Sequence, residues 1–196
     1  ARWIKSMTTV MGLTDEQVTE YKEQGWVVLP SVFSREELSV LERTSEEVLK
    51  RPGPEVAREA DGSPHVCWGM HLFDERFKAL TRHPELLYPV EQLLGSKVFV
   101  HQSRINIKQK NGSIVEWHQD FGTYHRIDGI PEARGIMVGI FLDDVTSCNA
   151  PVLAIPGSHK NGLVSEAVID EEVGDHEGAA KFRYDITDDT LSRLVD

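Results

Sequence analysis

The residues best suited to chemistry in this chain are His118 and Asp120, which flank one residue in the run Trp117-His118-Gln119-Asp120-Phe121. In an extended strand, side chains at positions i and i+2 point to the same face, so an imidazole nitrogen and a carboxylate oxygen would converge on one point. Two histidines and one carboxylate form the triad that holds ferrous iron with three coordination positions open. The pair therefore predicts two of the three protein ligands of such a site.

The spacing alone is a weak signal, because the chain has 8 histidines and 32 acidic residues and short motifs of this kind arise by chance. Many such pairs are a surface histidine beside a solvated carboxylate. His83-Pro84-Glu85 has the same spacing, yet a proline in that place is typical of the first turn of a helix. The rest of the chain must therefore decide whether His118 and Asp120 form a metal site or an ordinary surface pair.

The composition indicates a globular domain rather than a nucleic-acid or membrane protein. Of the 196 residues, 40% are hydrophobic and 27% are charged, which is ordinary for a soluble domain of this size. The net charge of −11 argues against nucleic acid and anionic membranes as partners. No apolar run approaches the ~20 residues of a membrane span. Cys67 and Cys148 have neither metal-ligand spacing nor the number for a disulfide framework, so we expect a cytoplasmic protein.

Local signals divide the chain into an early helical part and a later strand-rich part. Capping boxes at residues 14–17 and 34–37 begin helices, and Gly25 and Gly95 are typical of helix ends. Helices are predicted at residues 14–24, 34–50, 77–82, 84–94 and 188–196. Strands are predicted at residues 26–29, 98–109, 115–121, 136–142 and 152–155, and a tail or expression remnant at residues 1–13. This order indicates an α+β chain built on an antiparallel barrel or sandwich.

One predicted strand carries polar side chains on alternate positions. These are Gln102, Arg104, Asn106 and Lys108, which alternate with Ser103, Ile105, Ile107 and Gln109. A solvent-exposed strand face produces this alternation. A polar barrel interior that binds a small anionic cosubstrate produces it equally well. Both interpretations stay open at this point.

Two stretches of the chain resemble the phytanoyl-CoA dioxygenase superfamily of Fe(II)- and 2-oxoglutarate-dependent oxygenases. They are residues 116–131 and the tetrapeptide at residues 156–159, Pro-Gly-Ser-His. Within this superfamily the chain is most similar to the ectoine hydroxylase branch, whose signature F-x-W-H-S-D-F-E-T-W-H-A-E-D-G-[ML]-P falls on residues 115–131 without a gap. The matching positions are Trp117, His118, Asp120, Phe121, Thr123, His125, Asp128, Gly129 and Pro131.

The chain departs from that signature at several positions around the two metal-ligand candidates. Gln119 stands in place of Ser, Gly122 of Glu, Tyr124 of Trp and Arg126 of Ala. Further departures are Val115, Ile127 and Ile130. The resemblance places Gly122 and Tyr124 on the substrate side of the site. The substrate is therefore expected to be a small polar or zwitterionic molecule. An amino acid or another compact polar acid fits this expectation as well as ectoine does.

The resemblance also implies a fold, a reaction and a set of binding residues. The fold is a double-stranded β-helix (a cupin-like jelly roll) with N-terminal helices packed on it, as a single domain over residues 14–196. The reaction uses Fe(II), 2-oxoglutarate and O₂ to hydroxylate an unactivated C–H bond, with release of succinate and CO₂. His118 and Asp120 would hold the metal. Gln102, Asn106 and Tyr124 would bind 2-oxoglutarate, and Gln102, Arg104, Thr123 and Tyr124 would face the substrate. The implied partner is a small-molecule substrate. A homodimer is considered as an alternative to a monomer.

The family pattern also calls for a distal histidine and, about ten residues later, an arginine that pairs with the far carboxylate of 2-oxoglutarate. After residues 156–159 the remaining histidine is His176, in an acidic stretch, and Arg183 follows it too soon. We therefore expect the third ligand, this arginine and the closing barrel strands to be missing from these 196 residues. An alternative from another class is a non-catalytic jelly-roll binding module with a vestigial metal site. A zinc hydrolase is a weaker alternative, because the chain has no H-x-H or H-E-x-x-H spacing.

Overall fold

The computed structural model describes residues 12–108, 115–169 and 182–195 of the chain. The chain divides into two compact units. Unit 1 comprises residues 1–21, 27–112 and 137–151, and unit 2 comprises residues 22–26, 113–136 and 152–196. Both units mix helices with a small antiparallel sheet, which confirms the α+β class. The single domain over residues 14–196 stays a prediction.

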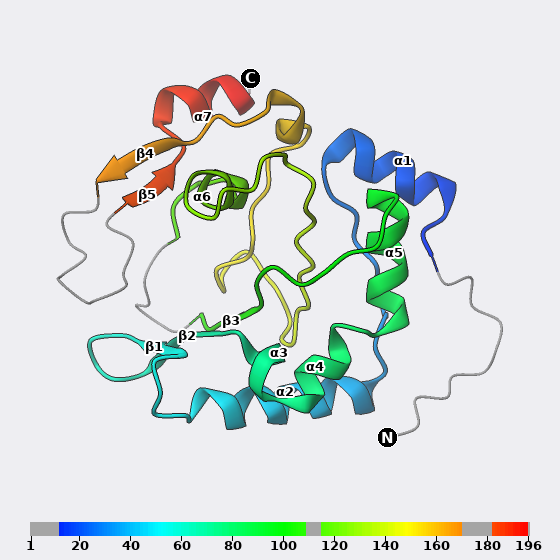
Figure 1. Cartoon of the computed structure of the whole chain (residues 1–196), viewed down its shortest axis with the longest axis vertical. Coiled ribbons are helices and arrows are strands. Elements are labelled where there is room, and N and C mark those ends of the chain that lie inside the picture. Colours follow the sequence, from blue (N-terminus) through cyan, green and yellow to red (C-terminus); the bar gives the residue numbers. More distant parts are fainter. Residues whose placement is uncertain (1–11, 109–114, 170–181, 196) are drawn as a thin grey trace. The chain divides into compact units, whose positions relative to one another are not determined.

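Unit 1 contains several helices and a three-stranded antiparallel sheet (Figure 1). Its helices are α2 (Arg35–Leu49), α3 (Met70–Phe73), α4 (Glu75–Leu80) and α5 (Pro84–Leu94), with most of α1 (Asp15–Gln24). Its strands are β1 (Val56–Arg58), β2 (Pro64–Trp68) and β3 (Arg104–Asn106), in the order β1-β2-β3. Helix α2 packs against both β2 and α4, which places the core of the unit between them.

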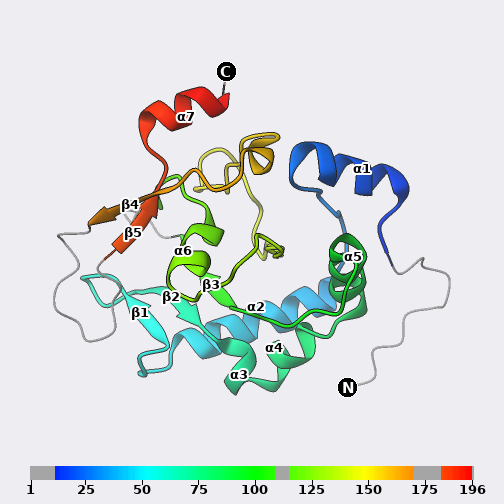
Figure 2. The same cartoon turned by 45° about the horizontal axis from the view of Figure 1, so that its top comes forward.

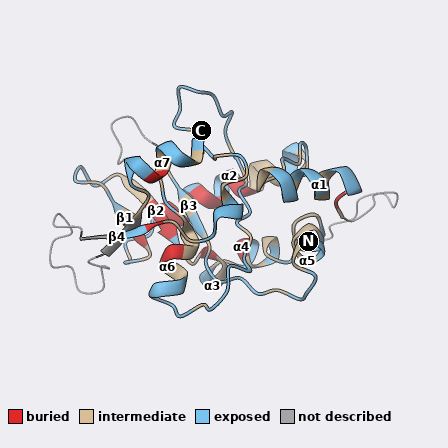
Figure 3. Cartoon of the chain, turned by 90° about the horizontal axis from the view of Figure 1, so that it is seen from above, coloured by how far each residue is buried: buried red, intermediate tan, exposed pale blue. Residues whose placement is uncertain are grey.

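The core of unit 1 lies where α2 meets the sheet. In Figure 3 the buried positions gather on α2, β1 and β2, whereas α1 has no buried residue. Cys67 on β2 is fully buried and pairs in register with Val56 on β1 and Ile105 on β3. The buried cluster consists of Leu41, Val48, Leu49, Val56, Cys67, Met70 and Phe77. Burial in these apolar surroundings raises the pKa of the Cys67 thiol, so this cysteine is a core residue rather than a nucleophile.

The helix boundaries follow the local signals. Thr14 and Gln17 form the predicted reciprocal capping bonds at 2.9 and 3.2 Å, and Ser34 and Glu37 do so at 2.6 and 3.2 Å. Gly25 and Gly95 have left-handed backbone conformations, with φ of 94° and 64°. Glycine adopts this conformation without the steric penalty that a Cβ imposes. The predictions for α1, α2, α4, α5 and α7 (Asp188–Val195) are confirmed.

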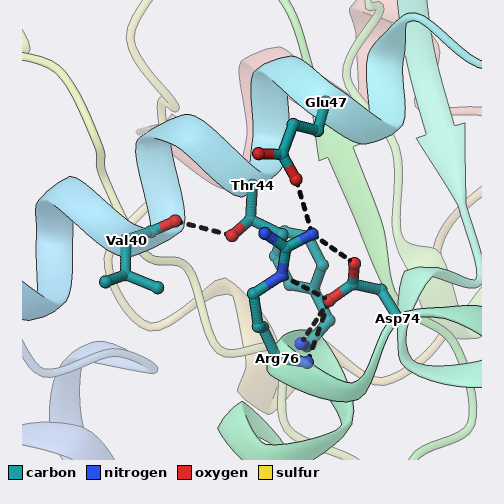
Figure 4. A network of polar contacts seen from close by, with 6 residues as sticks. Val40, Thr44, Glu47, Asp74 and Arg76 are labelled. Atoms are coloured by element: carbon teal, nitrogen blue, oxygen red, sulfur yellow. Dashed lines mark hydrogen bonds and ion pairs between the residues drawn. The ribbon is translucent and has the colours of Figure 1, made fainter.

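A network of polar contacts joins α2 to the start of α4 (Figure 4). The Arg76 guanidinium lies 2.7 Å from a Glu47 carboxylate oxygen and 2.8 Å from an Asp74 oxygen. Asp74 is the N-cap residue of α4 and accepts hydrogen bonds from the backbone N–H groups of Arg76 and Phe77. On α2, the Thr44 hydroxyl donates to the Val40 carbonyl at 2.6 Å. The hydrogen bond from Arg76 lowers the pKa of Asp74 below its ordinary value.

The pKa of Asp74 is lower in the folded than in the unfolded chain, so ionised Asp74 stabilises the fold at pH values above the unfolded-state pKa of 3.8. This contribution is lost as the pH falls through the folded-state pKa. We expect Asp74→Asn to lower the free energy of unfolding at pH 7 by about 1 kcal/mol, because it keeps the capping oxygen but loses the charge. The difference from wild type should be smaller at an acidic pH below 3.8, because Asp74 becomes protonated as the pH falls through its folded-state pKa. Urea unfolding at the two pH values measures this. Glu75→Gln is a matched control, since the Glu75 side chain is 88% exposed beside Lys78. An equal loss at both pH values would contradict the argument.

Unit 2 is smaller and contains a two-stranded antiparallel sheet (Figure 2). Its elements are α6 (Asp120–Arg126), the short 3₁₀ helix at Ser158–Asn161, β4 (Glu166–Ile169), β5 (Phe182–Asp185) and α7. The strands β4 and β5 pair with Glu166 opposite Asp185, and α6 packs against β5. His176 lies outside the described residues.

Most of the predicted strands are wrong. Of the strand predicted at residues 98–109, only β3 is present within the described part, and residues 115–121 change to a helix at Asp120. Residues 26–29, 136–142 and 152–155, all of them described, form no strand. Ile140 and Leu142 nevertheless pack against the core of unit 1. A short apolar run therefore does not make a strand by itself, because a strand also needs a hydrogen-bonding neighbour that the local sequence does not specify.

Among the described helices, none is both long and apolar enough to cross a membrane.

Candidate metal site

His118 and Asp120 lie in unit 2, where the chain changes from extended to helical backbone. His118 forms a single antiparallel bridge with Asp185, Gln119 is extended (φ −118°, ψ 119°), and Asp120 is the first residue of α6. The prediction that both residues lie on one strand is therefore wrong. Their side chains converge all the same, with Nε2 of His118 3.4 Å from Oδ1 of Asp120. An acidic residue in the first turn is favoured by the partial positive charge there, which explains why the helix begins at Asp120.

The orientation of the His118 ring suits a metal ligand. Its Nδ1 lies 2.7 Å from the carbonyl oxygen of Glu116. A carbonyl oxygen can only accept, so Nδ1 carries the hydrogen and Nε2 presents its lone pair on the side of Asp120. Histidines that bind metals commonly donate their other ring N–H in this way, which fixes both tautomer and ring angle. The carbonyl of Glu116 is a contributor that the sequence alone did not indicate, because any residue type supplies one.

The donor set fits two coordination positions of a divalent ion. Two ligand atoms about 2.1 Å from a shared ion and at right angles are about 3 Å apart, close to the 3.4 Å between His118 and Asp120. Both side chains are about one third exposed, at 35% and 30%, so an ion can reach them from solvent. Within residues 12–108, 115–169 and 182–195 there is no group of three or more His, Cys, Asp or Glu side chains placed to hold a metal.

Two further histidines of unit 2 make local contacts. His125 on α6 has Nδ1 2.8 Å from the carbonyl oxygen of Ile130, and its ring packs at 5.4 Å from that of Phe121. His159 has Nε2 3.1 Å from the carbonyl oxygen of Lys22, at the end of α1. These bonds hold the loop after α6 and the turn at residues 157–161 in place.

The polar residues predicted to bind cosubstrate or substrate are found in both units. Gln102, Arg104 and Asn106 of unit 1 are exposed, while the intervening Ile105 packs against the core. Gln102 lines a cavity of about 500 Å³ in unit 1, whose other lining residues include Trp68, His71, Leu72, Val100 and His101. In unit 2, Thr123 and Tyr124 lie on α6 and are half-buried. The binding roles of these residues stay predictions.

The chain is similar in sequence to known hydroxylases. The family model described as phytanoyl-CoA dioxygenase matches residues 21–190. An L-proline trans-4-hydroxylase of Streptomyces griseoviridis is 35% identical over 195 residues, covering 96% of this chain and 72% of that protein. An ectoine dioxygenase of Bordetella bronchiseptica is 31% identical over 191 residues, covering 93% of this chain and 61% of that protein.

Solved structures of EctD from S. alaskensis have the same fold. The apo form superimposes with a TM-score of 0.74 at 23% identity, covering 93% of this chain and 61% of that one. The form with 2-oxoglutarate and 5-hydroxyectoine gives a TM-score of 0.59 at 26% identity, covering 62% of this chain and 45% of that one. A third structure holds bound Fe. The chain therefore spans about half to three fifths of the length of these solved relatives.

Proposed function

Because the chain belongs to the phytanoyl-CoA dioxygenase family, we propose that the protein is an Fe(II)- and 2-oxoglutarate-dependent dioxygenase. It hydroxylates an unactivated C–H bond of a small polar or zwitterionic molecule and releases succinate and CO₂. The observation that carries the proposal is the His118–Asp120 pair, whose ligand atoms converge at 3.4 Å while the Glu116 carbonyl sets the tautomer of His118. This pair lies within the stretch that the family model matches.

The residues of this chain position the metal and the small molecules. His118 and Asp120 hold iron through one nitrogen and one oxygen, and Glu116 keeps the His118 ring from rotating. Iron bound at this pair would supply the oxidising chemistry, with 2-oxoglutarate and O₂ as cosubstrates. Gln102, Asn106 and Tyr124 are proposed to bind 2-oxoglutarate, and Gln102, Arg104, Thr123 and Tyr124 the substrate. None of these steps needs a side-chain general base.

The class of substrate is supported by the relatives named above. One acts on L-proline and another on ectoine, and both molecules are compact, ring-containing zwitterions. The chain is more identical to the proline hydroxylase, at 35%, than to the ectoine dioxygenase of B. bronchiseptica, at 31%. A free amino acid is therefore the substrate class that we favour over ectoine. We also propose that the whole protein folds as a double-stranded β-helix, which the TM-score of 0.74 supports.

The test is an anaerobic titration of the protein with Fe(II) and 2-oxoglutarate, followed by a turnover assay. The dioxygenase should develop the weak visible charge-transfer band of chelated 2-oxoglutarate, and then release succinate on exposure to O₂. The release should be strongest with one member of a panel of L-proline, other free amino acids, ectoine and small betaines. A binding module with a vestigial site would give neither the band nor succinate. Selective turnover of ectoine would exclude the amino acid.

A further inference from the structure

We propose that Gln119, Gly122 and Arg126 form a docking face that positions His118 and Asp120 by holding α6 against residues 162–165. The inference rests on the proposed metal site and adds the residues that keep its two ligands together. The three positions are spaced by three and four residues, so they share one side of α6 and its N-terminal approach. They are also three of the positions at which this chain departs from the ectoine hydroxylase signature.

Gln119 lies between the two candidate ligands in the sequence. Both the nitrogen and the oxygen of its side-chain amide form hydrogen bonds with the backbone of residues 162–165. Its Nε2 donates to the carbonyl oxygen of Gly162 at 2.8 Å. Its Oε1 accepts from the backbone N–H groups of Val164 at 2.7 Å and Ser165 at 3.0 Å. These three bonds tie the residue to a segment more than 40 positions later in the chain. A serine, as in the ectoine signature, is too short to make all three, so the glutamine adds an anchor at the point where strand geometry changes to helix.

Gly122 is buried at the contact between α6 and Ser165. A Cβ at this position would lie less than 3.0 Å from the Ser165 hydroxyl oxygen, a distance that real Cβ atoms essentially never show. Ser165 is itself only 2% exposed, so it has little room to move away. Glycine inside a helix costs about 1 kcal/mol relative to alanine. The close approach of Ser165 accounts for its presence, and the glutamate of the ectoine signature does not fit here.

Arg126 closes the same contact at the other end of α6. Its guanidinium donates to the carbonyl oxygen of Ser165 at 2.7 Å and to the Ser165 hydroxyl at 3.4 Å. Both ends of α6 are thus bonded to residues 162–165. At Gly122, between these ends, no side chain separates the helix from Ser165. Because Asp120 is the first residue of α6 and His118 lies two residues before it, this docking sets where the two ligand atoms meet. Groups outside the metal ligands that orient them typically change metal affinity by ~10- to 100-fold when removed.

The test is a suppressor experiment on the close contact between Gly122 and the Ser165 hydroxyl oxygen. Gly122→Ala should weaken anaerobic Fe(II) binding by ~10- to 100-fold. Ser165→Ala removes the obstructing oxygen and the longer of the two Arg126 bonds, but it keeps the 2.7 Å bond to the Ser165 carbonyl, so it should change affinity by less than ~3-fold. The double variant should return to within ~3-fold of wild type. Gly135→Ala is the matched control, because a Cβ at Gly135 meets nothing within 4 Å. A loss in Gly122→Ala that Ser165→Ala does not relieve would overturn the proposal.

A second measurement does not depend on metal. In Gln119→Ala, the backbone amides of Val164 and Ser165 lose their acceptor, so their hydrogen exchange in the metal-free protein should be at least ~10-fold faster than in wild type. Fe(II) affinity should fall with it. Unchanged exchange and unchanged Fe(II) affinity in a folded Gln119→Ala protein, with wild type binding normally, would refute the docking face and leave the proposed function standing. Failure of the wild type itself to bind Fe(II) would instead refute the proposed function. Should Gly122→Ala fail to fold, the Gln119→Ala result decides.

Discussion

Replacing His118 with alanine should lower iron- and 2-oxoglutarate-dependent succinate release by more than ~100-fold while leaving the fold intact. The loss must exceed the ~10- to 100-fold that follows removal of a group merely supporting a ligand, because His118 supplies a ligand atom itself. Stability should change by less than about 1 kcal/mol, since the side chain is 35% exposed and donates one hydrogen bond, to Glu116. Anaerobic Fe(II) affinity, succinate release and urea unfolding measure the three quantities.

His125→Ala is the matched control for this experiment. His125 also donates one hydrogen bond to a backbone carbonyl, that of Ile130 at 2.8 Å, but it lies at the other end of α6. Its replacement should leave Fe(II) affinity within ~3-fold of wild type, since it neither binds nor orients the metal in our proposal. Turnover retained in His118→Ala would remove His118 from the site. A loss in His125→Ala as large as in His118→Ala would make the third ligand His125 and revise the donor set.

Replacing Phe77 with alanine should lower the free energy of unfolding by about 3–5 kcal/mol. Phe77 lies on α4, is 6% exposed and belongs to the buried cluster of unit 1 with Leu41 and Val48. Removing its ring loses the burial free energy and leaves a cavity that the surrounding side chains fill only in part. Since domains are stable by only about 5–15 kcal/mol in total, the variant should be close to unfolding at ambient temperature.

Phe99→Ala provides the comparison for the Phe77 experiment, because Phe99 has the same side chain at 82% exposure. It should change the free energy of unfolding by no more than about 0.5 kcal/mol. Urea unfolding of both variants at pH 7 measures the difference. Similar losses in the two variants would mean that the cluster around Phe77 is not the part of the chain that stabilises unit 1.

The sequence by itself determined the features that depend on neighbouring residues. Thr14 with Gln17 and Ser34 with Glu37 cap their helices three residues apart, and Gly25 and Gly95 end α1 and α5. These signals are read correctly because each is satisfied within one helical turn. The family was also readable from sequence, since the run around His118 and the tetrapeptide at residues 156–159 are specific in length and type.

The tertiary structure decided how His118 and Asp120 are brought together. Period-two spacing placed His118 and Asp120 together on a strand, whereas they meet across a change from extended to helical backbone at Gln119. That change is stabilised by groups far along the chain, namely the backbone of residues 162–165, which bonds to Gln119 and Arg126. Strand pairing and the hydrogen bonds of Gln119 and Arg126 depend on a distant segment of the chain that supplies the partner groups. A local sequence pattern does not specify that segment. The chemistry of the pair is thus a property of the residue types, and its geometry is a property of the fold.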